Sequence, residues 1–175
     1  MNVLAFAASS SKQSINKQLA TFTASLVKEA NVEVLDLNEY EMPIYSSDRE
    51  NESGIPVLAQ QFFNKITQAD AVIISFAEHN GSYTAAYKNI FDWASRINQK
   101  VFQNKAMILL ATSPGPGGAQ SVLSAATGSA PFFAADVKAS VSVPSFYDNF
   151  DMDAQRITHA EILAQLQHAA DALTQ

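Results

Sequence analysis

The sequence predicts an α/β protein: a doubly wound sheet of five parallel strands with helices on both faces. Two observations support this prediction. Five short apolar runs alternate along the chain with segments whose apolar residues recur every three to four positions, as strands alternate with amphipathic helices. The runs also differ in how strictly apolar they are, and this difference predicts their order across the sheet.

Composition limits the class of protein before any element is placed. The chain has 175 residues, of which 47% are hydrophobic and 16% charged, so we expect one domain, residues 1–175, with a substantial core. Its net charge of −6 argues against partners such as nucleic acid or anionic membrane. We find no apolar stretch long enough to span a bilayer and no signal peptide. The absence of cysteine excludes disulfides and cysteine-bound zinc and fits a cytoplasmic protein.

The first half of the chain predicts two strands and one helix. The first strand is expected at Val3–Ala8 and the second at Val32–Leu37, where apolar residues concentrate. Between them a helix begins at about Ile15, because apolar residues recur there at helical spacing. After the second strand, residues 38–53 are expected to be irregular.

The second half continues the alternation. A helix with Pro56 near its first turn precedes a third strand at Ala71–Phe76, and another helix follows with Ile90 and Trp93 on its buried face. The remaining predicted elements are a fourth strand at Ala106–Thr112, a weak alanine-rich helix, a fifth strand at Val137–Val143 and a last helix that buries Ile162, Leu166, Ala169, Ala170 and Leu173.

Strand composition orders the sheet. The first, third and fourth runs are continuously apolar, which is typical of parallel strands buried on both faces. The fifth alternates strictly, and the second is interrupted by Glu33 and Asp36, so both are expected at the edges. The predicted order is therefore 2-1-3-4-5, that of the flavodoxin-like fold, in which ligands bind outside the carboxyl ends of the strands where the strand order reverses.

Three loops are expected at that crevice: residues 8–16, 77–82 and 113–118. The first carries four serine hydroxyls, Lys12 and Asn16 at a helix start, which favours a phosphate site. The alternative is that Ser14 only caps the helix. No dinucleotide-binding glycine motif or P-loop is present, so a monophosphate is favoured. The third loop has three glycines and two prolines, which lets backbone approach a flat ligand.

These residues resemble the NAD(P)H-dependent FMN reductase family of flavodoxin-like quinone, azo-dye and chromate reductases. The resemblance covers residues 1 to about 143 and is carried by Ser9…Ser14-Ile15-Asn16, by Glu78-His79-Asn80-Gly81-Ser82-Tyr83…Lys88-Asn89-Ile90-Phe91-Asp92-Trp93, and by Ser113-Pro114-Gly115…Gly117-Gly118. It implies an FMN-binding domain whose cofactor-binding residues are Ser9, Ser11, Ser14, Ile15 and Asn16 at the phosphate, Glu78, His79, Asn80, Gly81 and Ser82 along the flavin ring, and Ser113, Gly115, Gly117 and Gly118 at the ring edge.

The chain departs from the family pattern at two places. The family often has Gly-Ser-Leu-Arg where this chain has residues 8–11 as Ala-Ser-Ser-Ser, so the phosphate-binding arginine is missing and Lys12 is its nearest substitute. The family's Pro-Glu-Tyr-Asn is Ala-Glu-His-Asn at residues 77–80, which places an imidazole at the aromatic position. We expect His79 to pack there without transferring a proton.

The resemblance implies an oxidoreductase that passes hydride from NADPH or NADH to FMN and then electrons to a quinone-like or other small acceptor in a ping-pong reaction. The flavin carries the chemistry, so we expect no catalytic side chain and no metal. A homodimer or homotetramer is also implied, with the stripe Tyr83, Tyr87 and Phe91 at the interface, or else packed under residues 38–53. A flavodoxin-type electron carrier and a flavin-free binding protein on the same fold remain alternatives.

Overall fold

Five parallel strands form the central sheet of the computed structural model, which describes residues 1–174. Their order is β2-β1-β3-β4-β5, so the predicted flavodoxin-like topology is confirmed. The strands span Asn2–Ala8 (β1), Asn31–Leu35 (β2), Ala71–Phe76 (β3), Ala106–Thr112 (β4) and Asp136–Val143 (β5). All four neighbouring pairs are parallel, as right-handed crossovers through helices require.

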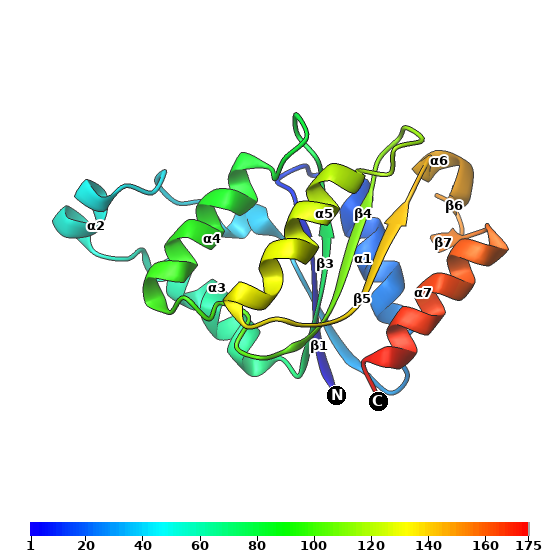
Figure 1. The fold of residues 1–175 in the computed structure, drawn as a ribbon, viewed down its shortest axis with the longest axis horizontal. Helices are drawn as coiled ribbons and strands as arrows, with labels where there is room; N and C mark the ends of the chain where they lie inside the picture. Colours follow the sequence, from blue (N-terminus) through cyan, green and yellow to red (C-terminus); the bar gives the residue numbers. More distant parts are fainter. Residues whose placement is uncertain (175) are drawn as a thin grey trace.

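Helices cover both faces of this sheet (Figure 1). One face carries α3 (Val57–Gln68), α4 (Ala85–Ile97) and α5 (Gln120–Ser129), and the other carries α1 (Ile15–Ser25) and α7 (Ala160–Ala172). Each face has its own core of buried side chains. Phe6 and Phe62 meet edge to face in the first core, with ring centroids 5.6 Å apart, whereas Leu19 and Leu166 are fully buried in the second.

Burial along the strands follows the predicted ranking. Every residue of β3 is buried, and β1 is buried from Val3 onward. In contrast, β5 alternates between more and less exposed residues over most of its length, and β2 is exposed except for Leu35. The two alternating or interrupted strands are indeed the edges of the sheet, where only one face is covered.

The segment after β2 was predicted wrongly in part. The strand ends at Leu35 and not at Leu37, because the Asp36 carboxylate accepts a hydrogen bond from the Asn38 N–H (2.9 Å) and starts a short 3-10 helix, η1 (Leu37–Tyr40). Residues 38–53, expected to be irregular, also contain the helix α2 (Ser47–Ser53), which Ser46 caps. Both elements follow from local side-chain caps rather than from apolar periodicity.

The helix α2 stands away from the body of the protein at the end of an arm formed by residues 43–56 (Figure 1). None of its residues is buried. The arm is anchored to α4, because the Trp93 indole N–H donates to the Pro43 carbonyl (2.7 Å) and the Arg96 guanidinium pairs with the Glu50 carboxylate (2.9 Å). A cluster of polar and aromatic contacts therefore holds a segment that has no apolar core of its own.

The aromatic stripe of Tyr83, Tyr87 and Phe91, at and just before α4, does not pack against this arm. Phe91 contacts Phe102 and Phe133, with ring centroids 5.7 and 4.7 Å apart, and Tyr83 and Tyr87 contact Phe76. The alternative that the stripe lies under residues 38–53 is therefore wrong, since Trp93 and Asn89 hold that segment instead.

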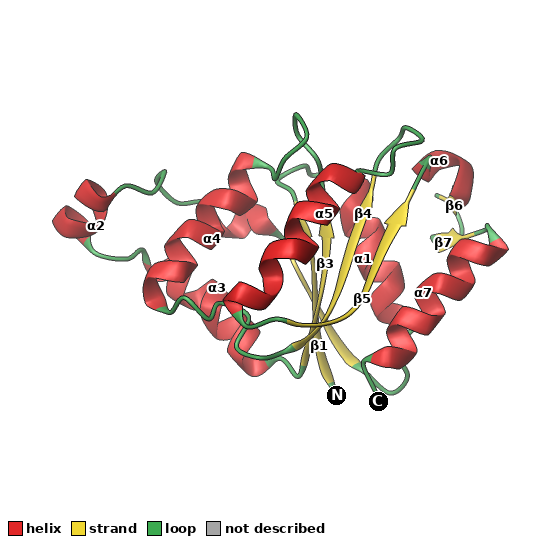
Figure 2. Cartoon of the chain, in the orientation of Figure 1, coloured by secondary structure: helices red, strands yellow, loops and turns green. Residues whose placement is uncertain are grey.

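Further short elements lie near the ends of the sheet. These are the 3-10 helix η2 (Ala130–Phe133), α6 (Phe146–Asn149), and the strands β6 (Phe150–Asp151) and β7 (Arg156–Ile157), which form a small antiparallel pair. Long connections emerge at the carboxyl ends of the central strands, whereas the first and last described residues lie near the opposite end of the strands (Figures 1 and 2). Within residues 1–174, no helix combines the length and the hydropathy needed to cross a bilayer.

Candidate functional site

The three predicted loops meet around one pocket at the carboxyl ends of β1, β3 and β4. Its volume is about 250 Å³, and its lining comprises Ser9, Ser11, Gln13, Ser14, Ile15, Asn16, Ala77, Glu78, His79, Thr112, Ser113, Pro114 and Tyr147. Larger hollows of about 290 and 340 Å³ lie elsewhere. We assign the site to the three-loop pocket because it joins all three loops at the point where strand order reverses.

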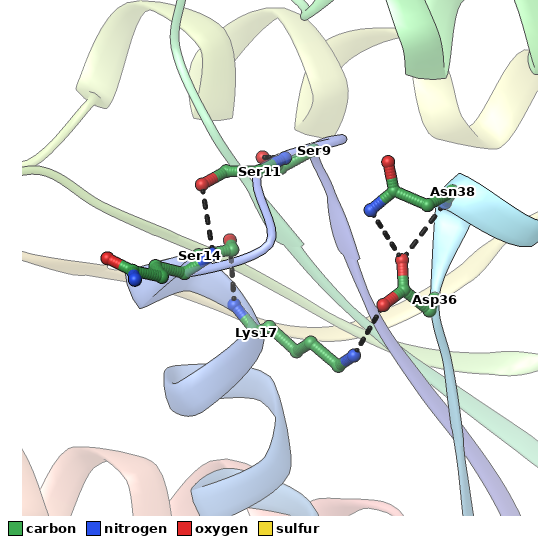
Figure 3. A network of polar contacts seen from close by, with 7 residues as sticks. Ser9, Ser11, Ser14, Lys17, Asp36 and Asn38 are labelled. Carbon is green, nitrogen blue, oxygen red and sulfur yellow. Dashed lines mark hydrogen bonds and ion pairs between the residues drawn. The ribbon is translucent and has the colours of Figure 1, made fainter.

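Serine hydroxyls shape the first loop (Figure 3). Ser9 Oγ accepts a hydrogen bond from the Ser11 N–H (3.1 Å), and Ser11 Oγ accepts one from the Gln13 N–H (3.3 Å). Ser14 caps α1 by accepting from the Lys17 N–H (3.1 Å). Each hydroxyl acts as an acceptor in these bonds, so its own O–H remains available to donate to an anion.

The start of α1 adds further donors. The first i→i−4 bond of the helix runs from the Gln18 N–H to the Ser14 carbonyl (3.3 Å), so the N–H groups of Ile15 and Asn16 lie ahead of the hydrogen-bonded turns. Such groups and the helix dipole favour a bound anion. Ser14 therefore caps the helix, and this cap does not exclude an anion at the same helix start.

The Asn16 side chain has a scaffold role. It is 3% exposed, and its amide Nδ2 donates to the Thr112 carbonyl (3.2 Å). Its Oδ1 accepts from the Ser75 hydroxyl (2.7 Å) and from the Thr112 N–H (3.1 Å). This brace ties the start of α1 to the ends of β3 and β4, and with it the first loop to the third.

The pocket is lined almost entirely by neutral groups. Among the lining residues only Glu78 is an acid, and none is a lysine or arginine. Lys17 is directed away from the loop and pairs with Asp36 (2.9 Å; Figure 3). Its hydrogen bond, with that of the Asn38 N–H, lowers the pKa of the Asp36 carboxyl. A phosphate here would depend on hydroxyls and backbone N–H groups.

The second loop is a tight turn fixed at both ends. His79 and Ser82 exchange two backbone hydrogen bonds (3.0 and 3.1 Å), while Asn80 and Gly81 have φ angles of 53° and 74°. Two positive φ angles make a type I′ turn, which Asn-Gly favours. At its base, the Glu78 carboxylate accepts from the Val122 N–H at the start of α5 (2.8 Å). These hydrogen bonds therefore hold the turn in place at the rim of the pocket.

The third loop is pinned to the segment that follows β5. The N–H groups of Phe146 and Ser145 donate to the carbonyls of Ser113 and Gly115 (3.0 and 2.9 Å). Gly118 has a φ of 57°, and a Cβ there would lie 2.3 Å from Ser142 Oγ. This glycine is thus required by close packing on β5.

The structure brings part of the predicted set into the pocket lining: Ser9, Ser11, Ser14, Ile15, Asn16, Glu78, His79 and Ser113. The others belong to the same loops but lie outside the lining: Asn80, Gly81, Ser82, Gly115, Gly117 and Gly118. The predicted site residues did not include five others that line the pocket: Gln13, Ala77, Thr112, Pro114 and Tyr147. Tyr147 is 59% exposed and comes from α6, just after β5, so treating the end of the fifth strand as a fourth loop would have found it.

Comparison with known proteins shows the family to which the chain belongs. The sequence model of the NADPH-dependent FMN reductase family matches residues 1–148. The quinone reductase of Escherichia coli K12 is 31% identical over 122 residues, and the NADPH:quinone oxidoreductase of Arabidopsis thaliana is 30% identical over 125. Each match covers 69% of this chain, but 64% and 62% of those two proteins. An uncharacterized Mycoplasma pneumoniae protein is 30% identical over 81% of this chain and 86% of its own.

Solved structures share the fold. The flavoenzyme NAD(P)H:(acceptor) oxidoreductase FerB from Paracoccus denitrificans superimposes with a TM-score of 0.77 at 23% identity, covering 98% of this chain and 94% of that one. The NAD(P)H:quinone oxidoreductase from Methanothermobacter marburgensis gives 0.65 at 17% identity, covering 100% and 96%. With a family match over most of its length and this topology, the chain belongs to the NADPH-dependent FMN reductase family.

Proposed function

We propose that the chain is an FMN-dependent oxidoreductase that accepts hydride from NADPH or NADH and passes electrons to a small quinone-like acceptor. One observation carries this proposal: three loops from separate parts of the sequence meet in one pocket that offers serine hydroxyls and a helix N-terminus. The quinone reductases of Escherichia coli and Arabidopsis thaliana among the relatives support the acceptor class.

The donor chemistry of the pocket fits a flavin monophosphate. The Ser9, Ser11 and Ser14 hydroxyls and the first N–H groups of α1 would hold the phosphate, and they can do so without a cation. The Asn16 brace would keep that loop against the third loop. Bound FMN supplies hydride acceptance and electron transfer, so the protein's part is to bind, orient and exclude water.

The walls of the pocket would position the flat part of the ligand. His79 on the second loop and Tyr147 on α6 present planar side chains, while Pro114 adds a rigid surface. The turn at His79–Ser82 keeps its N–H groups in place through its own hydrogen bonds, which reduces the reorganisation that binding requires. We assign no proton transfer to His79.

A direct test compares two serines of the first loop. Ser11→Ala removes a hydroxyl from the pocket lining, whereas Ser10→Ala changes an exposed serine beside a different hollow. A hydrogen bond to a charged group contributes about 1.5 kcal/mol or more, so Ser11→Ala should weaken FMN binding about tenfold. Ser10→Ala should leave it unchanged. Riboflavin, which lacks the phosphate, should bind both variants as it binds the unaltered protein.

Oxidation of NADPH or NADH by the FMN-loaded protein then distinguishes an oxidoreductase from an electron carrier. An FMN-loaded protein that oxidises NADPH or NADH with 1,4-benzoquinone supports the oxidoreductase. A protein that binds FMN but does not react with either nucleotide would be an electron carrier. The absence of lysine and arginine from the pocket lining favours a flavin-free binding protein as the second candidate, and failure to bind added FMN would establish it.

The proposal also includes an oligomeric state and a cellular location for the protein. We propose a homodimer or homotetramer, to be checked by sedimentation velocity of the purified protein. A cytoplasmic location is supported by the lack of cysteine and by the use of NADPH or NADH as donor, and fractionation of the source cells tests it.

A further inference from the structure

The turn of the second loop holds the only Asn-Gly pair in the sequence, Asn80 and Gly81. Both residues are exposed, and they form the tip of the turn between His79 and Ser82. An asparagine that precedes a glycine loses its side-chain amide readily, because glycine has no Cβ to shield its backbone nitrogen. The reaction joins the Gly81 nitrogen to the side-chain carbon of Asn80, so it requires that both groups be accessible.

Both reacting groups are free in this turn. Within residues 1–174, neither the Gly81 N–H nor the Asn80 carboxamide makes a hydrogen bond. A Cβ built on Gly81 would have no atom within 4 Å, so the space around this backbone is open. In the described chain the turn is closed by two backbone hydrogen bonds between His79 and Ser82, and so short an exposed turn opens locally while the domain stays folded. Opening lets the Gly81 nitrogen approach the carboxamide.

Asn104 has the same backbone conformation but lacks these features. It is exposed, and its φ of 59° is close to the 53° of Asn80. Its successor is Lys105, which has a Cβ and whose N–H donates to the Phe102 carbonyl (2.9 Å). Asn104 lies just before β4, at the end of the sheet opposite the three-loop pocket. The chain therefore contains its own matched control for the reactivity of Asn80.

We propose that Asn80 is a site of spontaneous deamidation, which adds a carboxylate to the loop that already carries Glu78. The Gly81 nitrogen attacks Asn80 Cγ. The new N–Cγ bond forms, the Cγ–Nδ2 bond breaks, and ammonia leaves with the proton of the Gly81 N–H. Water then hydrolyses the cyclic succinimide at either carbonyl and gives aspartate or isoaspartate. No electrons are transferred, and water is the co-reactant.

The consequence for ligand binding rests on the proposed function. The phosphate of FMN is anionic, and no lysine or arginine among the pocket-lining residues would offset a further negative charge. Two like unit charges about 4 Å apart in water repel each other enough to weaken binding about fivefold. The isoaspartate product also lengthens the main chain by one methylene, which disrupts the backbone pairing of His79 with Ser82. Deamidation should therefore reduce the affinity of the pocket for FMN.

The modification is tested on the purified full chain, incubated in mildly alkaline buffer and sampled over time. Mass spectrometry of tryptic peptides reports the conversion of each asparagine, and a methyltransferase specific for isoaspartate detects that product. Asn80 should convert about tenfold faster than Asn104, or more, because Asn80 precedes a glycine. Equal rates at the two asparagines, or no conversion of Asn80, would overturn the proposal.

Two aspartate variants test the effect on FMN. Asn80→Asp reproduces one product, and Asn104→Asp adds the same charge at the opposite end of the sheet. Fluorescence titration with FMN should show binding about fivefold weaker for Asn80→Asp and unchanged for Asn104→Asp. Equal affinities of the two variants would refute the effect on the pocket. If the unaltered protein does not bind FMN, the proposed function fails, whereas the peptide masses still decide whether Asn80 is modified.

Discussion

Replacing Asn16 by alanine should destabilise the whole protein, because its side chain braces three elements at once. The substitution removes the bonds to the Ser75 hydroxyl and to the N–H and carbonyl of Thr112. All three residues are buried, with exposed fractions of 3% for Asn16, 0% for Ser75 and 2% for Thr112. Water cannot readily replace the lost partners, so the effect should exceed that of a surface substitution.

The magnitude follows from those three bonds. Each contributes a net of roughly 1 kcal/mol, and a buried group left without a partner adds a penalty of about 1–3 kcal/mol. The Ser75 hydroxyl can rotate to another acceptor, whereas the Thr112 backbone groups cannot. We therefore expect Asn16→Ala to lower the free energy of unfolding by about 3 kcal/mol, a large fraction of the 5–15 kcal/mol typical of a domain.

Urea unfolding followed by circular dichroism measures this loss, and a cycle with Ser75→Ala should show that the two effects are not additive. Gln18→Leu is the matched control on the same helix, because the Gln18 side-chain oxygen is buried without a hydrogen-bond partner in the described chain. That variant should be neutral or slightly stabilising. A loss below about 0.5 kcal/mol for Asn16→Ala would refute the brace. Unchanged stability with strongly weakened FMN binding would instead assign the Asn16 side chain to the cofactor.

Two further predictions concern the third loop and the end of β2. Gly118→Ala should destabilise by about 1–3 kcal/mol in thermal unfolding, because its φ is positive and a Cβ would overlap Ser142 Oγ, whereas Gly117→Ala, with no atom within 4 Å, should have little effect. Equal shifts for both would disprove this packing argument. The pKa of Asp36 is lowered by Lys17, so the ion pair stabilises the folded state above the unfolded pKa and is lost as pH falls below 3.8 through the folded value. Asp36→Asn should therefore flatten the loss of stability on acidification, and identical pH profiles would contradict it.

Periodicity predicted the sheet well because it reports burial directly. The unbroken runs of β3 and β4 and the strict alternation of β5 reflect how many faces each strand has covered, which is also what sets strand order. Apolar periodicity did not predict where β2 ends. Asp36 and Ser46 set local structure through single side-chain hydrogen bonds, and such caps leave no repeating pattern.

The sequence predicted the loops of the candidate site, but only part of the side chains that line its pocket. The place where strand order reverses located all three loops, yet the Asn16 carboxamide, expected at a phosphate, is directed into the scaffold. Its partners, Ser75 and Thr112, lie 59 and 96 positions away in sequence, so no local pattern reveals them. Periodicity also gave no indication of Tyr147, because it reaches the pocket from a short helix.

The arm that carries α2 is a suitable place to open the chain in a circular permutant. It contacts α4 through the Pro43 carbonyl, the Tyr45 N–H and the Glu50 carboxylate, and the first and last described residues lie at the end of the sheet opposite the pocket. A circular permutant opened between Asn51 and Glu52, with the old ends joined by a short linker, should therefore fold into the same architecture. Reporter domains inserted at that position would lie away from the sheet and leave the three-loop pocket accessible.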